Sequence, residues 1–426
     1  MARRPSQTEN TVYNKTVLKN GLRVVTEKMP SVRSISLGVW LDVGSRNESA
    51  EENGLSHFIE HMLFKGTKTR TARQIAASLE SIGGGLNAFT SREQTCYVAR
   101  ILDEHLNIAV DVLADMVCNS TLSPVNLGRE KKVICEEIKE SLDTPTDYIH
   151  DLFARTFWGK HPLGRPIMGS IRNISQMPRH RVTGYLKRNY RAGSTVIAAS
   201  GFVPHDRLVK LVRGKFRFDE GAAPAPVTAA RDRNRNIIFK EDDNQQTHLC
   251  LGFPGLDYAA DGKTAALVLS LYLGGGMSSV LFQKIREDRG LAYTVYTFMD
   301  FYRDSGLFGA YLGTDHRRLK EAADIMLAEF ARMKKRRLAP GTLEKAKNQL
   351  KGNIVLGMEA TQSRMNRLGR QELMYGEFRT LERTLKEIDR VSSSDILELS
   401  NRLFDTDRMA IAVLGPADRK ALNHVG

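Results

Sequence analysis

The sequence predicts an α+β protein of two homologous domains, each a mostly antiparallel β-sheet packed with helices. The first observation is the Ala- and Pro-rich segment 221–230, near the middle of the 426 residues, which has no apolar periodicity and predicts an extended linker. The second is a repeat, because the segments around Gly38 and Gly252 are alike, and so are those ending at Gly201 and Gly415. Both glycine pairs are 214 residues apart, which indicates a duplicated domain. The predicted domains are therefore residues 1–220 and 231–426.

Strand and helix patterns alternate irregularly in the first half. The segment Lys19–Gly21 predicts a hairpin, since Asn and Gly tolerate positive φ. Four β-rich runs predict strands, at Thr11–Leu18, Leu22–Glu27, Gln94–Leu102 and Thr195–Ser200. Apolar residues at helical spacing predict helices at Gly54–Phe64, Ala72–Ile82, Leu106–Val117 and Asn126–Leu142. This mixed order favours α+β over a doubly wound parallel sheet.

Composition excludes several classes of protein. Hydrophobic residues make up 41% and charged residues 26%, as in ordinary globular proteins, and no apolar run is long enough to span a bilayer. Arg3 and Arg4 have no hydrophobic stretch behind them, so a secretory signal is not expected. Four scattered cysteines without a CxxC pair predict buried thiols in a reducing compartment: Cys96, Cys118, Cys135 and Cys250. No complete transit peptide is visible, so we expect a bacterial cytoplasm, with a matured protein of the mitochondrial matrix as the alternative.

The net charge of +14 is spread over both halves of the chain. Its densest run, Lys334–Arg337, follows apolar positions at helical spacing and predicts a basic helix end, where cations meet the helix dipole favourably. No nucleic-acid-binding motif accompanies these charges. A solvated surface is therefore favoured over RNA binding, and no nucleic-acid partner is expected.

The pentapeptide from His57 to His61 carries the chemistry. On a helix His57 and His61 lie one turn apart on one face, and Glu60 lies close to both. Two imidazoles at this spacing can ligate one Zn²⁺, and the neighbouring carboxylate can reach a metal-bound water. The order H-x-x-E-H is the inverse of the commoner H-E-x-x-H peptidase motif.

A catalytic zinc site needs a third protein ligand and an open position for water. The predicted helix Asn126–Leu142 offers acidic candidates, among which Glu130 and Glu137 share a face because they are seven residues apart. Spacing alone does not choose among four of them: Glu130, Glu136, Glu137 and Glu140.

Three stretches in the first half resemble the pitrilysin/insulinase zinc peptidases: His57–Thr67, Gly83–Thr90 and Val133–Glu137. In the second half, Leu273–Phe282, Ile285–Tyr293 and Ser363–Glu372 are similar to that family's C-terminal signatures. The branch that the chain resembles most is the mitochondrial processing peptidase β-subunit and its bacterial relatives. The likeness extends from about Val17 to Gly415.

The resemblance implies roles residue by residue. His57, His61 and Glu137 match the family's zinc ligands, one Zn²⁺ per chain, and Glu60 matches its general base. Glu130 matches a carboxylate that orients a ligand.

For the substrate, Asn87, Ala88 and Phe89 match the edge strand that pairs with an extended peptide. Arg286 and Tyr293 match a C-terminal pair that holds the substrate near the scissile bond. His161 also fits the family pattern, but a structural loop is the favoured interpretation for it.

The function implied is a zinc-dependent endopeptidase that hydrolyses unfolded peptides or presequence-like segments inside a closed chamber. At the 214-residue offset, His57 and His61 fall on Leu271 and Gly275, so the second half cannot build a second metal site and would close over the first. The family implies a dimer, expected here as a homodimer or as a heterodimer with an inactive homologous chain. The alternative is a non-catalytic core or scaffold subunit, or one subunit of a heterodimeric processing peptidase.

Overall fold

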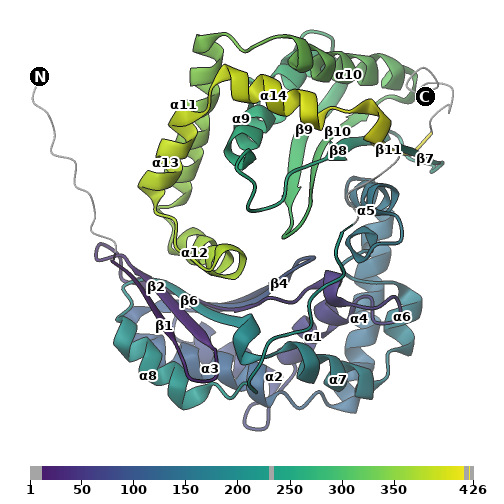
Figure 1. The fold of residues 1–426 in the computed structure, drawn as a ribbon. Coiled ribbons are helices and arrows are strands. Elements are labelled where there is room, and N and C mark those ends of the chain that lie inside the picture. The colour runs from purple at the N-terminus through teal and green to yellow at the C-terminus, as the bar shows by residue number, and fades with distance from the viewer. Residues whose placement is uncertain (1–11, 230–234, 417–421, 423–426) are drawn as a thin grey trace, which may run out of the picture. The chain divides into compact units, whose positions relative to one another are not determined.

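A computed structural model describes residues 12–229, 235–416 and 422, so Arg3, Arg4, Thr11 and Ala230 lie outside the described residues. The chain forms two compact units (Figure 1). The first contains the residues up to Ile138 together with Pro166–Pro226 and Gly357–Phe378. The second contains Lys139–Arg165, Val227–Leu356 and the residues from Arg379 onward. Each unit therefore includes a segment from the other side of the predicted linker.

The first unit is built on a six-stranded sheet in the order β1-β2-β6-β3-β5-β4. Its neighbouring strands are antiparallel except β2 and β6, which are parallel. The strands are β1 (Val12–Val17), β2 (Arg23–Lys28), β3 (Ser34–Leu41), β4 (Gly85–Thr90), β5 (Thr95–Leu102) and β6 (Thr195–Gly201). Strand β4 ends the sheet, so one of its edges has no partner strand in this sheet.

Both faces of this sheet are buried. On one face, side chains such as Val24 and Leu37 join the core formed with the first unit's helices, while the alternate residues Val25 and Trp40 face the other way. The helices are α1 (Leu55–Leu63), α2 (Ala72–Glu80), α3 (Leu106–Asn119), α4 (Pro124–Asp143, which continues into the second unit), α6 (Ile171–Gln176), α7 (Arg179–Asn189) and α8 (His205–Lys215).

The second unit is built on a five-stranded sheet in the order β7-β11-β8-β10-β9. Only β7 and β11 are parallel. The strands are β7 (Asn236–Lys240), β8 (Thr247–Pro254), β9 (Ala292–Phe301), β10 (Gly306–Thr314) and β11 (Ala410–Leu414). Besides α5 (Pro145–Trp158), which is described below, the helices of this unit are α9 (Lys263–Gly274), α10 (Leu319–Lys335), α11 (Pro340–Gly357), α13 (Leu381–Arg390) and α14 (Ser393–Leu403).

The two sheets share one topology, as a duplicated domain predicts. Strands β4-β5-β3-β6-β2 and β9-β10-β8-β11-β7 follow the same order, with the same single parallel pair. The repeat extends to the glycines at the ends of β6 and β11. Gly201 and Gly415 both adopt positive φ, of 122° and 120°. A Cβ would approach a backbone oxygen to 2.0 Å at Gly201 and to 2.6 Å at Gly415, so both positions favour glycine.

A pair of helices is exchanged between the halves of the sequence. Helix α12 (Thr361–Tyr375) packs on β6, β3 and β2 of the first unit, where Met365 lies against Trp40. Helix α5 (Pro145–Trp158) packs on β11, β8 and β7 of the second unit, where Phe153 joins the core. The compact units thus differ from the contiguous halves by these two helices. Adding 214 to the bounds of α5 gives 359–372, close to those of α12, so the exchange is reciprocal.

Other sequence predictions have direct structural outcomes. Residues 221–229 contain no helix or strand, and α10 ends at Lys335 inside the basic run. None of the four cysteines forms a disulfide, as predicted, and Cys96 and Cys250 are buried. The prediction of buried thiols is wrong for Cys118 and Cys135, which are half-buried. Within the described residues, no helix combines the length and apolar character needed to cross a membrane.

Candidate metal centre

The centre is built on α1, whose first turn is held from outside the helix. Gly54 precedes the helix with φ of 100° and offers no capping side chain. Glu48 takes this role, because its carboxylate accepts from the backbone N–H groups of Gly54 and Ser56, both at 2.7 Å, and from the Asn53 amide at 3.1 Å. Glu48 is buried, and burial raises its pKa to about 7 despite these hydrogen bonds.

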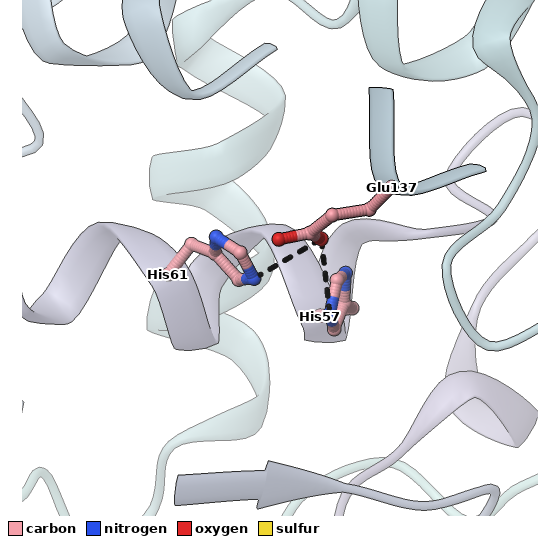
Figure 2. A group of neighbouring side chains, drawn as sticks. All are labelled: His57, His61 and Glu137. Carbon is pink, nitrogen blue, oxygen red and sulfur yellow. Dashed lines mark ion pairs between the residues drawn. The ribbon is translucent and has the colours of Figure 1, made fainter. Parts of the chain in front are cut away.

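Helix α1 places two imidazoles side by side. Its apolar face, including Phe58, Ile59 and Met62, is buried in the first unit's core, which orients His57 and His61 together on another side. The ring centroids are 4.6 Å apart (Figure 2). The predicted one-turn spacing is therefore realised as a pair of neighbouring rings.

Glu137 reaches both rings from helix α4 (Figure 2). Its Oε2 lies 3.5 Å from Nε2 of His61 and 4.0 Å from Nε2 of His57. Tetrahedral zinc, with bonds of about 2.1 Å, would separate its ligand atoms by about 3.4 Å, so the donor set fits zinc in both kind and spacing. In the part of the chain that the structure describes, no other set of three such side chains gathers this closely.

Glu130 fixes the orientation of His61. Its Oε2 lies 3.3 Å from Nδ1 of His61, and because an ionised carboxylate only accepts, this contact favours the tautomer with the proton on Nδ1. The lone pair of Nε2 is then directed toward Glu137. The other oxygen of Glu130 pairs with Nζ of Lys65 at 3.0 Å.

His57 is held in the neutral form that metal ligation requires. Burial, with a smaller effect from nearby His61, lowers its pKa to about 4. Its Nδ1 is buried without a hydrogen-bond partner among the described residues, while Nε2 faces Glu137. The ring is therefore neutral at pH 7, with an unprotonated nitrogen available to a metal.

Glu60 lies on the same helix and is not a member of the three-residue group. Burial raises its pKa, while a hydrogen bond from the hydroxyl of Thr90 lowers it. The Thr90 Oγ1 to Glu60 Oε2 distance is 2.5 Å. Glu60 is half-buried, and a carboxylate whose pKa is raised binds a proton more readily than a fully exposed one.

Four acidic candidates on α4 were left open by spacing, and the structure distinguishes them. Glu137 meets both histidines and Glu130 meets only His61. Glu136 and Glu140 are exposed and take no part in the three-residue group.

The predicted substrate-strand residues all lie on β4. Asn87 is exposed, while Ala88 and Phe89 are half-buried, and β4 is the end strand of its sheet. An end strand has backbone groups available to pair with another extended chain.

Arg286 and Tyr293 lie in the second unit and contact each other. Arg286 is part of a π-helical turn, Phe282–Glu287, and its guanidinium carbon lies 4.5 Å from the ring centroid of Tyr293. Tyr293 falls where the register of β9 and β10 shifts, and it is 73% exposed. Bulges and π turns are frequent at functional sites. Tyr293 also lines a hollow of about 550 Å³, together with Arg317 and Arg318.

His161 has a structural role. Its Nδ1 accepts from the backbone N–H of Leu163 at 3.2 Å and so caps the short turn Pro162–Gly164. This agrees with the structural loop expected for it.

Three residues that support the centre were missed by sequence reasoning. Lys65 lies two residues beyond the end of α1, so helical spacing does not apply to it, and no local pattern connects it with Glu130. Thr90 directly follows the predicted substrate strand, but no local pattern connects it with Glu60. Glu48 precedes the helix by several residues, so no standard capping spacing applies.

Two family models match the chain. The insulinase model, peptidase family M16, matches residues 23–171, and the model of the M16 inactive domain matches residues 176–350. The first match contains His57, Glu60, His61 and Glu137.

Relatives match over nearly the whole length. The "Uncharacterized zinc protease YmxG" of Bacillus subtilis is 40% identical over 94% of this chain and 97% of its own. An "Uncharacterized zinc protease" of Mycobacterium leprae is 41% identical, with 96% of this chain and 93% of its own covered.

Solved structures share the fold. A protease from Helicobacter pylori superposes with a TM-score of 0.91 at 21% identity, covering 95% of this chain and 100% of its own. A Pseudomonas fluorescens structure, described as a peptidase M16 inactive domain, gives 0.88 at 20% identity, with 95% and 98% covered.

Proposed function

This chain belongs to peptidase family M16, the insulinase family, and from that premise we propose that it is a zinc-dependent endopeptidase acting on unfolded peptides or presequence-like segments. The observation that carries the proposal is the convergence of His57, His61 and Glu137 beside the half-buried carboxylate of Glu60. The likeness to the processing-peptidase branch remains a prediction from sequence.

The three side chains would hold one zinc ion per chain. Zinc bound there would make a water molecule more acidic and polarise the scissile carbonyl. Glu60 would accept the proton of the attacking water on its carboxylate and return it to the leaving amine. Glu130 would keep His61 in the ligating tautomer throughout.

Strand β4 would bind the substrate as an added strand. Asn87, Ala88 and Phe89 would pair through their backbone with an extended peptide, which reads extension more than side-chain identity. The mode needs a segment that is extended and has free backbone groups, and unfolded peptides meet this need most readily.

Arg286 and Tyr293 would bind the substrate near the scissile bond, and either Tyr293 or Arg286 would also donate a hydrogen bond to the developing oxyanion. Their support is the exposed Tyr293 ring, its bulged backbone and its contact with Arg286.

The second half carries Leu271 and Gly275 where a second histidine pair would stand, and its family model is described as inactive.

The proposed assembly is a homodimer that encloses a chamber, with a heterodimer containing an inactive homologous chain as the alternative. The proposed compartment is a bacterial cytoplasm, supported by the bacterial origin of the relatives named above, with the mitochondrial matrix as the alternative.

The deciding experiment combines metal analysis with cleavage of a quenched unfolded peptide. We expect about one zinc per chain, cleavage that is lost on chelation, and recovery on adding Zn²⁺. Glu60→Gln should retain zinc and lose turnover, and a variant with near-wild-type rate would contradict the role of Glu60.

Two other outcomes separate the alternatives. Stoichiometric zinc without cleavage of any peptide would point to a missing partner chain. A protein that binds no zinc would contradict the ligand assignment and favour the non-catalytic scaffold.

A further inference from the structure

The carboxylate of Glu60 is held at one oxygen only. The Thr90 hydroxyl donates to Oε2 at 2.5 Å, within the range of short O–H···O⁻ hydrogen bonds. Within the part of the chain that the structure describes, Oε1 accepts no hydrogen bond. The two oxygens of this carboxylate therefore have different surroundings.

We propose that Thr90 is a positioning residue for the general base: its hydroxyl holds Oε2 of Glu60, so that Oε1 is presented to the attacking water. The inference rests on the proposed function, since it concerns the same carboxylate. It adds a residue from β4 to a centre otherwise drawn from α1 and α4.

Thr90 is well suited to hold another side chain in place. It is β-branched, so few χ1 rotamers are open to it, and it pairs with Thr95 across the β4–β5 hairpin. The hairpin is closed by hydrogen bonds from Ser91 N to Gln94 O at 2.7 Å and from Gln94 N to Ser91 Oγ at 3.0 Å. The backbone of Thr90 is therefore held by its pairing with Thr95 and by the hydrogen bonds of the turn that follows it, and this fixes where its hydroxyl lies.

The hairpin is also fastened to the segment that precedes α1. The N–H of Arg46 donates to the carbonyl of Arg92 at 2.7 Å, and the N–H of Ser45 donates to the carbonyl of Ser91 at 3.2 Å. A Cβ on Gly44 would lie 2.3 Å from the Ser91 oxygen, so this approach needs glycine. Hydrogen bonds therefore connect the hairpin that carries Thr90 with the segment that leads into α1, the helix that carries Glu60.

Such support matters because a glutamate side chain has three rotatable bonds. A general base must lie within about 2.6–3.2 Å of the proton that it removes, so free rotation of Glu60 would lower the fraction of productive geometries. Strand β4 is also the proposed substrate strand, and one strand would then fix both the substrate and the base.

The test compares three variants of the full-length, zinc-loaded protein. Thr90→Val removes the hydroxyl at nearly constant shape, and we expect kcat to fall about 10- to 100-fold with little change in KM or zinc content. Thr90→Ser keeps the hydroxyl and should restore kcat to within a few-fold of wild type.

Thr95→Val is the matched control. It removes one hydroxyl from the cross-strand partner of Thr90, but that hydroxyl donates to the Val43 carbonyl at 2.9 Å and not to Glu60. This variant should lower thermal stability and retain kcat.

A Thr90→Val enzyme with kcat within twofold of wild type would overturn the proposal, as would equal losses in the Val and Ser variants, since strand packing would then explain both. A second readout does not need activity: crystal structures of metal-free wild type and Thr90→Val should show the Glu60 carboxylate displaced in the variant. An unmoved Glu60 would overturn the proposal even if the wild type cleaves no peptide, an outcome that would count separately against the proposed function.

Discussion

Nζ of Lys65 lies 3.0 Å from Oε1 of Glu130, so the carboxylate that contacts His61 through its other oxygen is itself paired with a cation. Glu130 is buried, and a buried carboxylate needs such partners because water is excluded. Glu130 thus connects Lys65 with His61, and the ion pair with Lys65 holds the carboxylate in place beside the imidazole.

Glu130→Gln should weaken zinc binding by about 10- to 100-fold, since it loses the carboxylate that orients His61. Competition with a chromogenic chelator measures this directly. Glu140→Gln is the control on the same helix, because Glu140 is exposed and outside the group. Equal zinc affinities of the Glu130 and Glu140 variants would contradict the role of Glu130.

Glu48→Gln should change how stability depends on pH. The pKa of Glu48 is raised to about 7 in the fold, mainly by burial, against an ordinary value of 4.5. As pH rises from about 4.5 to about 7, the unfolded chain loses this proton first, so the contribution of Glu48 to stability falls. In urea unfolding of metal-free protein, the advantage of wild type over the variant should shrink by about 2–3 kcal/mol between pH 5 and 7.5. An advantage independent of pH would show that Glu48 has an ordinary pKa.

Gly369→Ala should disrupt the packing of α12. A Cβ there would lie 2.5 Å from Nε1 of Trp40, so we expect a loss of about 1–3 kcal/mol and altered tryptophan fluorescence. Gly352→Ala, on α11 with no atom within 4 Å of its Cβ, should instead gain about 0.5–1 kcal/mol. A Gly369 variant as stable as wild type would mean that α12 does not press on Trp40.

Tyr293→Phe should lower kcat by about 100-fold with zinc content unchanged, if its hydroxyl stabilises the oxyanion as proposed. Tyr272→Phe is the control, because the Tyr272 hydroxyl accepts from Arg332 within the second unit. Parallel kinetics on the quenched peptide measure both. An unchanged kcat in Tyr293→Phe would leave Tyr293 without a catalytic role.

The local elements could be predicted from the sequence because each depends on nearby residues. The predicted helix Gly54–Phe64 is observed as Leu55–Leu63, and the predicted strand Gln94–Leu102 as Thr95–Leu102. The hairpin at Lys19–Gly21 is confirmed, with φ of 89° at Gly21. Hydrophobic period and turn residues carry this information directly.

The exchange of α5 and α12 could not be predicted in the same way. An apolar stripe shows that a helix covers something, but not which sheet it covers. The metal ligands were accessible because one helical turn relates His57 to His61, whereas Glu137 needed the family pattern. Thr90 and Glu60 meet only through tertiary packing, 30 residues apart.

The exchanged helix also has a consequence for synthesis on the ribosome. The last strand of the first sheet ends at Gly201, whereas the helix that covers Val25, Trp40 and Val196 begins at Thr361. At about 5–20 residues per second, the 159 residues between them take about 8–32 s to make. During that time all six strands of the first sheet have been synthesised, but the apolar face that α12 covers is still exposed. That face is a natural target for a chaperone, and a point at which translation speed affects the yield of folded protein.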